Sequence, residues 1–502
     1  MTPKQAPSMP APPAAPFERG REAHESAGGA LALVAAVTAA ALALYLFRLG
    51  HKSFWLDEGA SFAFARIPLS DLWDLAATRQ ANMSLYYLLL HFWMWLGEGE
   101  AVLRTLSVLF AAGTVPLTYL IGRRLFGLRA GVIAGALIAL NAFVVQYAQE
   151  ARGYTLALFL ATLASYLLVR AVEEPARSLW VAYGLVVGLG AYAHLFVLLV
   201  AGAHLLAVVG TRRGRRVLRP ALGALGGGLL LALPMVLFPL VGDRGQIDWL
   251  GAPGVREVVT GIGELVGDGG AFLLLAYVAA VGAAFVAGSS HDRSWAFTVA
   301  GTWLFLPIVV SAVASTAKPI FLPRYLIVCV PALAVLAGAG VAALGRLAAA
   351  VVASALVAGS AFGLWTWYFD TPKEEWRPAA EHVIDNARPQ DGIVVYAGRA
   401  RRPFEYYVAR DDAEDQVPDP LFPAGEWGSD PSAPVGQPRL AQLRNEFARL
   451  DRVWLILSHA RTGPGSVRNL KLLTDALESS LDLASSFRFY RVEVNLYTAE
   501  MN

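Results

Sequence analysis

The sequence predicts a polytopic α-helical membrane protein that carries a separate α/β domain after its last membrane helix. The chain of 502 residues is 56% hydrophobic and only 16% charged, whereas soluble domains are about a quarter charged. Long uncharged apolar runs recur from Leu31 to about Phe369, and runs of this length are typical of membrane-spanning helices. After Asp370 the composition becomes that of an ordinary soluble domain.

The two ends of the chain differ from the apolar middle. Residues 370–502 carry 16 Lys and Arg against 21 Asp and Glu, although the whole chain has a formal net charge of +2. Residues 1–30 are rich in Pro and Ala without apolar periodicity, so we expect a disordered cytoplasmic tail. The first apolar run begins late and is as long as a full span, which indicates a retained helix rather than a signal peptide.

The positions of Lys and Arg predict how the helices are oriented. Five basic connections are placed in the cytoplasm: Arg123–Arg129, Arg170–Arg177, Arg212–Arg219, Arg293 and Arg346. The resulting alternation gives about eleven spans, with the N-terminus inside and residues 370–502 outside. The predicted spans are 31–48, 104–122, 130–148, 154–170, 179–193, 195–210, 220–240, 270–288, 295–314, 326–344 and 347–368.

One apolar segment does not fit this alternation. The sequence LYYLLLHFWMWLG at 85–97 is shorter than the roughly 20 residues that a spanning helix needs. We therefore expect it to lie along the outer interface of the membrane. The transmembrane domain is then 31–369, with a long outer first loop at 49–103.

Five polar features are predicted to share the outer face. The first feature contains two adjacent acids, Asp57 and Glu58, next to a predicted membrane span. Charged residues at such positions are unfavourable, and they usually have a functional role. A cavity with acids and several cations would suit a phosphate-bearing lipid. The features are Asp57 and Glu58 in FWLDEGASF, YAQEARGY at 147–154, His194, the loop at 241–268 and KPIFLPRY at 318–325.

The chain after Asp370 alternates between helical and extended patterns. AAEHVIDNA precedes GIVVYAG, RLAQLRNEFARL precedes VWLILSHA, and NLKLLTDALESSL precedes SFRFYRVEVNLYTA. Such alternation predicts a small α/β domain. No phosphate-binding loop or nucleophile motif occurs in it, so catalysis is not expected to lie there.

Several motifs, taken in order, resemble a known family. They are FWLDE, LYYLLLHFW, RTLSVLFAAGTVPLTYLIGRRLFG, YAQEARGYTL, FLPRYLIVCVPALAVLAGAG and DTPKEEWRPAAEHVIDNARPQDGIVVYAG. Over roughly residues 31–400 the chain resembles GT-C glycosyltransferases of the protein O-mannosyltransferase and lipid A aminoarabinose transferase type, which are glycosyltransferase family 39-like. It departs from them at Asn82-Met83-Ser84, where the family commonly has His-Pro-Pro or Lys-Pro-Pro.

The resemblance implies a GT-C fold and an inverting transfer of a hexose or pentose. The donor would be a polyprenyl-phosphate-linked sugar, not a nucleotide sugar, and the acceptor would be an unspecified protein, glycan or lipid outside the cell membrane. The resemblance implies that Asp57 is the general base and that Arg152 and Arg324 bind the phosphate of the carrier. These roles agree with the chemistry, because a carboxylate can take the acceptor proton and guanidinium groups bind phosphate bidentately.

The remaining candidates take supporting roles, and each has a structural alternative. Glu58 is a second candidate catalytic acid that could instead cap a helix. Arg152 could snorkel to the interface, and Lys318 could be an interfacial anchor. The further candidates are Lys318 and Tyr325 at the phosphate, Gln149 and Glu150 as groups that orient Arg152, and His194 as support.

A different class of function is a transporter or flippase that moves polyprenyl-linked sugars without chemistry. Such a protein would be expected to have ionisable residues inside its helices and inverted repeats, whereas the predicted helices are nearly free of charge. The enzyme is therefore the favoured interpretation, with no cofactor, no metal and no nucleic-acid partner expected. The protein would be a multi-pass protein of the cell membrane with an extracytoplasmic active site.

Overall fold

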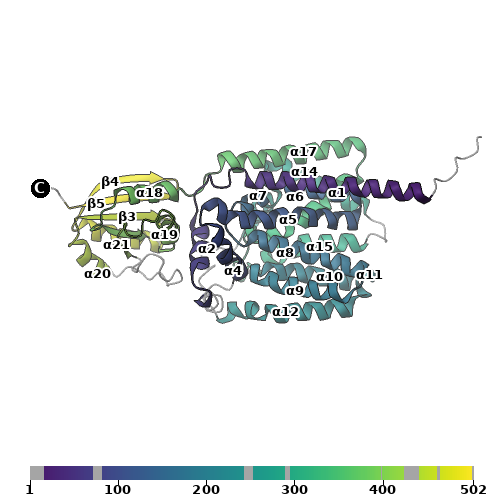
Figure 1. Ribbon diagram of the computed structural model, residues 1–502, viewed down its shortest axis with the longest axis horizontal. Helices are drawn as coiled ribbons and strands as arrows, with labels where there is room; N and C mark the ends of the chain where they lie inside the picture. The colour runs from purple at the N-terminus through teal and green to yellow at the C-terminus, as the bar shows by residue number, and fades with distance from the viewer. Residues whose placement is uncertain are drawn as a thin grey trace, which may run out of the picture.

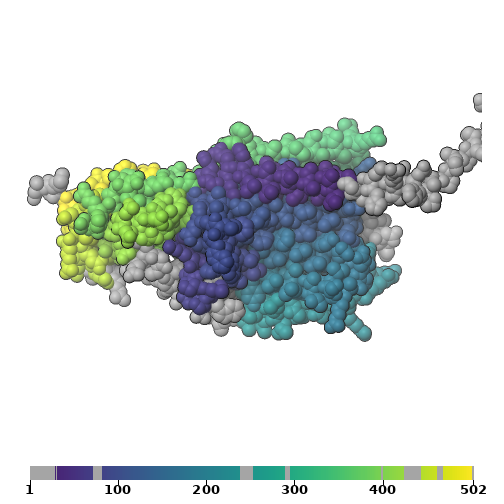
Figure 2. Space-filling view, in the orientation of Figure 1, coloured from purple at the N-terminus to yellow at the C-terminus, as the bar shows by residue number. Residues whose placement is uncertain are grey.

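A computed structural model of the chain describes residues 16–71, 82–241, 253–288, 294–396, 398–422, 440–460 and 464–499. A bundle of long, roughly parallel helices is joined at one end to a small sheet domain (Figure 1). Figure 2 shows the two parts in contact, with the sheet domain seated on the end of the bundle. The predicted fold class, a polytopic helical protein with a C-terminal α/β domain, is confirmed.

Each of the eleven predicted spans coincides with helix. By length and apolar character, seven helices in the described residues could cross a membrane, or eight if the bent pair α6–α7 is one span. The count of eleven is thus not reached by these criteria alone. The helices are α1 (Pro16–Leu46), α5 (Glu100–Phe126), α6 (Leu128–Ala139), α7 (Ala142–Ala148), α8 (Tyr154–Glu173), α9 (Arg177–Ala193), α10 (Phe196–Gly210), α12 (Leu218–Val241), α14 (Gly270–Ala287), α15 (Ser294–Ala314), η4 (Pro323–Cys329) with α16 (Val330–Ala343), and α17 (Arg346–Trp365) with η5 (Thr366–Asp370).

Two helices differ from the prediction. The first begins at Pro16, so residues 16–30 are helical rather than part of a disordered tail, and residues 1–15 lie outside the described residues. Glu, Arg and Ala in this stretch favour helix, and the apolar run that follows provides a nucleus for it. The span predicted at 130–148 is broken into α6 and α7, which differ in direction by 54°.

The break between α6 and α7 has an identifiable local cause. Asn141 caps α7 by accepting a hydrogen bond of 3.0 Å from the Val144 N–H. Its side-chain N–H₂ group donates to the Leu265 carbonyl at 3.0 Å, beside α13 (Val255–Val266). Asparagine favours such cap positions, and the new helix direction ends in the turn that holds residues 149–153.

Two short helices lie across the end of the bundle, between it and the sheet domain (Figure 1). They are α2 (Leu56–Arg66) and α4 (Ser84–Trp93), and η1 (Met94–Leu96) follows α4. With ten residues, α4 is too short to span a membrane. The interfacial position of residues 85–97 stays a prediction.

The sheet has five strands in the order β2-β1-β3-β5-β4. Strand β1 runs parallel to β2 and β3, whereas β5 runs antiparallel to β3 and β4. One apolar cluster consists only of residues from 394 onward, including Val394, Phe447 and Leu473, so the domain has a core of its own. The strands are β1 (Gly392–Tyr396), β2 (Pro420–Phe422), β3 (Arg452–Ser458), β4 (Asp482–Phe489) and β5 (Val492–Thr498); the helices are α18 (Trp376–Asn386), α19 (Arg401–Arg410), α20 (Leu440–Phe447) and α21 (Pro464–Glu478).

The last predicted strand, SFRFYRVEVNLYTA, is in fact part of the hairpin of β4 and β5. The chain turns at Tyr490 and Arg491, and Arg491 has a left-handed φ of 60°. Hairpin turns of this kind usually contain Asn-Gly or another Gly pair. Because neither occurs here, the sequence carried no turn signal.

The sheet domain rests directly on α2 through the first turn of α19. A Cβ atom at Gly59 would come within 2.6 Å of the Pro403 backbone nitrogen, a distance that no side chain tolerates. Phe54, just before α2, stacks on Tyr406 of α19 with ring centroids 4.3 Å apart. The glycine that follows the Asp57-Glu58 pair therefore permits the close approach of the two parts.

We predict that the end of the bundle that bears the sheet domain is extracytoplasmic. With Cys329 replaced, single cysteines at His51 and Asp482 should react with an impermeant maleimide on intact cells. A cysteine at Arg129 should react only after the cells are lysed. All three positions are exposed, and labelling of positions 51 and 129 from the same side would contradict the predicted topology.

Candidate functional site

The candidate site lies at the end of the bundle, where α2, the turn after α7 and η4 meet. Asp57, in the first turn of α2, stands between two arginines. Its Oδ2 atom is 3.9 Å from Arg152 Nη2 and 3.7 Å from Arg324 Nη1. The side chains of Asp57, Arg152 and Arg324 retain 24%, 12% and 20% exposure, so the structure brings together three predicted residues that solvent still reaches.

Arg152 is anchored along one edge of its guanidinium group. Its Nη1 atom donates to the Asp57 carbonyl at 3.2 Å and to the Tyr87 hydroxyl at 3.1 Å. The Nε atoms of Arg152 and Arg324 are buried and have no hydrogen-bond partner among the described residues. Both guanidinium groups therefore keep donors that a bound anion could use.

Aromatic rings surround these two cations. The guanidinium carbons of Arg152 and Arg324 lie 5.8 and 6.0 Å from the ring centroid of Tyr154. Arg324 lies 5.9 Å from the ring of Tyr325 and 6.0 Å from that of Trp55. Tyr325 thus lines the site as predicted, and the rings hold the cations by cation–π attraction.

His194 lies beside Tyr325, with ring centroids 4.5 Å apart, and is 3% exposed. Burial, together with Arg152 and Arg324, lowers the pKa of His194 to about 3, so its ring is neutral at pH 7. The Nδ1 atom accepts the Phe196 N–H at 3.2 Å, which leaves the proton on Nε2. That Nε2 atom has no partner among the described residues, so His194 presents an unused neutral donor.

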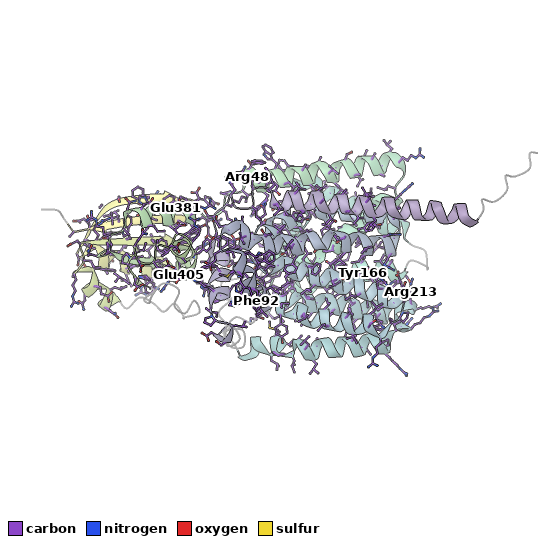
Figure 3. The ribbon with its side chains drawn as sticks, in the orientation of Figure 1. Arg48, Phe92, Tyr166, Arg213, Glu381 and Glu405 are labelled. Carbon is purple, nitrogen blue, oxygen red and sulfur yellow. The ribbon has the colours of Figure 1, made fainter. Side chains whose placement is uncertain are left out.

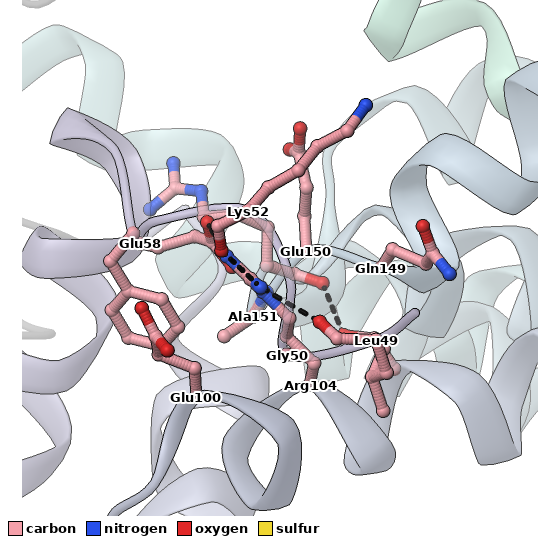
Figure 4. Close-up of polar contacts among 12 residues, drawn as sticks. Leu49, Gly50, Lys52, Glu58, Glu100, Arg104, Gln149, Glu150 and Ala151 are labelled. Carbon is pink, nitrogen blue, oxygen red and sulfur yellow. Dashed lines mark hydrogen bonds and ion pairs between the residues drawn. The ribbon is translucent and has the colours of Figure 1, made fainter. Parts of the chain in front are cut away.

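Glu58 differs sharply from its neighbour Asp57, because its side chain is wholly buried. Its two oxygens accept from Arg104 at 2.7 and 2.9 Å and from the Ala151 N–H at 3.0 Å (Figure 4). The Oε2 atom also accepts from Lys373 Nζ at 2.7 Å. Burial alone would raise the pKa of Glu58, but Arg104 and Lys373 lower it to about 2. Because this carboxylate is wholly buried and its oxygens are all paired, the geometry favours a positioning role over contact with an acceptor, and the catalytic role of Glu58 stays a prediction.

Arg104 and Lys373 are residues of this site that sequence reasoning missed, and Arg104 makes the most contacts. Besides Glu58, its guanidinium group donates to the carbonyls of Leu49 and Lys52 at 2.8 Å and of Ser53 at 3.1 Å. It therefore fixes the segment that leads into α2. The available signal was a lone charge at the start of the apolar run RTLSVLF, since charges at such positions are usually paired.

Two further predicted residues, Gln149 and Glu150, have side-chain partners other than Arg152. Gln149 does not orient Arg152; its Nε2 donates to the carbonyls of Tyr45 at 3.0 Å and Phe47 at 2.7 Å, and its Oε1 accepts from Trp367 at 2.8 Å. Glu150 faces Lys373 instead, with 3.5 Å between Oε1 and Nζ.

Lys318 is exposed, with no ion pair to a described residue. In the loop at 241–268, residues 242–252 lie outside the described residues. Across the described ranges, no three His, Cys, Asp or Glu side chains gather in a way that could hold a metal ion.

We predict that Arg104→Leu lowers the free energy of unfolding by about 3–5 kcal/mol, since it leaves Glu58 buried with only part of its charge compensated. The matched control is Arg124→Leu, which removes the partly exposed ion pair with Glu173 and should cost about 0–1 kcal/mol. Thermal unfolding in detergent compares the two variants. Equal losses of stability in the two variants would show that breaking the buried pair costs no more than breaking the partly exposed one.

Comparison with known proteins gives a partial match in sequence. Residues 81–241 match the profile of the family described as dolichyl-phosphate-mannose-protein mannosyltransferase. No protein of curated function matches the chain.

The match in structure covers nearly the whole chain. The crystal structure of ArnT from Cupriavidus metallidurans bound to undecaprenyl phosphate has a TM-score of 0.64 and 14% identity, and the match covers 92% of this chain and 97% of that one. For the Archaeoglobus fulgidus oligosaccharyltransferase AglB, in complex with an inhibitory peptide and a dolichol-phosphate, the TM-score is 0.51 at 12% identity, with 94% and 74% covered. The resemblance predicted from the motifs is confirmed: the chain has the GT-C glycosyltransferase fold, and its residues 81–241 match the mannosyltransferase family.

Proposed function

We propose that the protein is an inverting membrane glycosyltransferase that moves a hexose or pentose from a polyprenyl-phosphate carrier to an extracytoplasmic acceptor. The observation that carries this proposal is the partly exposed Asp57 carboxylate between Arg152 and Arg324. A carboxylate and two guanidinium groups in one site supply a base and an anion-binding pair. The mannosyltransferase profile at 81–241 and the carrier lipids bound to ArnT and AglB support the same reaction class.

In this mechanism Asp57 takes the proton of the acceptor hydroxyl. The hydroxyl oxygen forms a bond to the anomeric carbon on the face opposite the phosphate, so the configuration inverts. The bond from that carbon to the phosphate oxygen breaks, and its electron pair leaves with the polyprenyl phosphate. A general base of this kind must lie within hydrogen-bond reach of the proton that it removes, which requires the exposure that Asp57 retains.

Arg152 and Arg324 stabilise the negative charge that grows on the leaving phosphate. Their contacts to Asp57, at 3.9 and 3.7 Å, are longer than the roughly 2.7–3.2 Å of a hydrogen bond. Both arginines therefore attract the Asp57 carboxylate without a hydrogen bond to it, although Arg152 Nη1 donates to the Asp57 backbone carbonyl at 3.2 Å. When a phosphate arrives, both can turn their free donors to it while their charges still favour ionised Asp57.

His194 fits the same donor site as a neutral group. Its Nε2–H is buried without a partner among the described residues, and an unpaired buried donor costs about 1–3 kcal/mol. An oxygen of the carrier headgroup would satisfy it. The role of support expected for His194 is retained as part of the proposal.

The distribution of charge supports an extracytoplasmic site. Figure 3 shows Arg213 at the end of the bundle remote from Glu381 and Glu405 of the sheet domain. Basic connections concentrate on the cytoplasmic side of membrane proteins. The end that holds Asp57 and the sheet domain would then face outward, where the acceptor is available.

We predict that Asp57→Asn abolishes transfer while folding and carrier binding stay near wild type, because asparagine keeps the shape but cannot accept the proton. The assay is transfer from a polyprenyl-phosphate sugar by the reconstituted protein. The control is Asp71→Asn, an exposed acid in the same outer loop, which should leave the rate unchanged. Transfer by the Asp57→Asn variant within a few-fold of wild type would exclude Asp57 as the base.

We predict that Arg152→Ala and Arg324→Ala each slow transfer roughly ten- to a hundred-fold, the equivalent of about 1.5–3 kcal/mol for one charge-assisted contact. Lysine at either position should be milder, because it keeps the charge but loses the planar fork. Turnover should fall more than carrier affinity, since charge on the leaving oxygen develops only in the transition state.

Donor titrations that follow turnover and binding separately test both arginines. The matched control is Arg66→Ala, which removes an exposed arginine of α2 outside the site. If both site variants keep wild-type turnover and affinity, the phosphate is bound elsewhere.

A further inference from the structure

Residues 371–377, here called the strap, comprise the connection after η5 and the first two residues of α18, and they contact both parts of the molecule. Toward the bundle, the Lys373 ammonium lies 2.7 Å from Glu58 Oε2 and 3.5 Å from Glu150 Oε1. Its side chain is only 10% exposed. Lys373 therefore lies between two buried carboxylates next to the proposed base.

The strap is fixed to the same region a second time by Arg377. Its Nη2 atom donates to the Gly50 carbonyl at 2.8 Å and pairs with Glu100 of α5. The Arg377 N–H donates to Ser53 Oγ at 3.3 Å. The segment before α2 is thus held by Arg104 from the bundle and by Arg377 from the strap.

The residues between these two cations contact the sheet domain. Glu374 accepts from Trp376 at 2.9 Å and pairs with His459, after β3, at 2.7 Å. Glu375 exchanges two hydrogen bonds with Tyr490 at the β4–β5 turn, of 3.1 and 2.8 Å. The strap consequently links the sheet domain to the Asp57-Glu58 turn.

We propose that Lys373 is a positioning residue through which the sheet domain sets the geometry of the active site, an inference that rests on the proposed glycosyl transfer. Arg104 compensates the charge of Glu58, whereas the ion pair of Glu150 within the described residues is with Lys373, and the Oε2 atom of Glu150 is buried without a partner among those residues. Lys373 contacts both acids. Without the ammonium that lies 2.7 Å from one acid and 3.5 Å from the other, the repulsion between these two buried like charges is no longer offset.

A displacement of Glu58 would change the positions of both Asp57 and Arg152. Asp57 precedes it in α2, and the Ala151 N–H that donates to Glu58 at 3.0 Å precedes Arg152. A shift of Glu58 therefore moves the base and one phosphate-binding arginine together. Misplacement by about 1 Å is enough to cost roughly a hundred-fold in rate.

The test compares Lys373→Met with Lys471→Met, an exposed lysine of α21, in the full-length reconstituted protein. Lys373→Met should lower kcat by roughly a hundred-fold while affinity for polyprenyl phosphate stays within a few-fold. Lys373→Arg should retain more activity, since it keeps the charge. Lys471→Met should match wild type in both measurements.

A second variant separates positioning from loss of the fold. In Lys373→Met/Glu150→Gln the opposing charge is gone, so kcat and the thermal midpoint should both recover relative to Lys373→Met. A wild-type kcat in Lys373→Met would overturn the inference. The inference would also fail if Lys373→Met lowered kcat, carrier affinity and the thermal midpoint equally and the added Glu150→Gln restored none of them. A wild-type protein without transfer activity would reject the proposed function, whereas the recovery of thermal midpoint tests the charge balance independently of any substrate.

Discussion

The buried pair of Glu58 and Arg104 is the interaction on which the rest of the site depends. Glu58 belongs to α2 and Arg104 to α5, and the same carboxylate also accepts from Lys373 and from the Ala151 N–H. Burying two charges costs much of what their attraction gains, so such pairs contribute little net stability. The pair instead fixes the position of α2, because both oxygens of the Glu58 carboxylate accept from donors in other segments of the chain.

That fixed position explains why two adjacent acids can have different roles. Successive residues of a helix point about 100° apart, so when Glu58 is directed into the protein, Asp57 is turned toward the two arginines. Glu58 is wholly buried and Asp57 keeps 24% exposure. One acid orients the helix, and the other remains available to an acceptor. In the proposed mechanism the pair is therefore a positioning carboxylate, Glu58, preceded in the chain by the base, Asp57, rather than two catalytic acids.

Helices could be located well from the sequence, whereas contacts between side chains far apart in the chain could not. Charge-free runs located the helices, and positive loops with the family motifs brought Asp57, Arg152 and Arg324 to one face. The partners of Glu58 could not be inferred, because Arg104 and Lys373 are 46 and 315 positions away and a single chain holds no signal that pairs them. The β4–β5 hairpin was missed for a local reason, since its turn lacks glycine. The difference in exposure between Asp57 and Glu58 depends on tertiary packing, so it could not be predicted from the sequence of the motif.

The contacts around α2 also indicate which parts of the site can move. Glu58 holds this helix from the bundle side, and Gly59 lies against the start of α19 on the other. The Phe54 N–H donates to the Tyr407 hydroxyl at 2.7 Å, and that hydroxyl donates to Glu100 at 2.6 Å. In the proposed mechanism a base on a helix held this firmly is preorganised. The two arginines lie 3.7–3.9 Å from the Asp57 carboxylate, and Arg152 Nη1 also donates to the Asp57 backbone carbonyl at 3.2 Å. In that mechanism an arriving phosphate would take up the free donors of both arginines while their charges still favour ionised Asp57, so that donor binding would prepare the base for the acceptor.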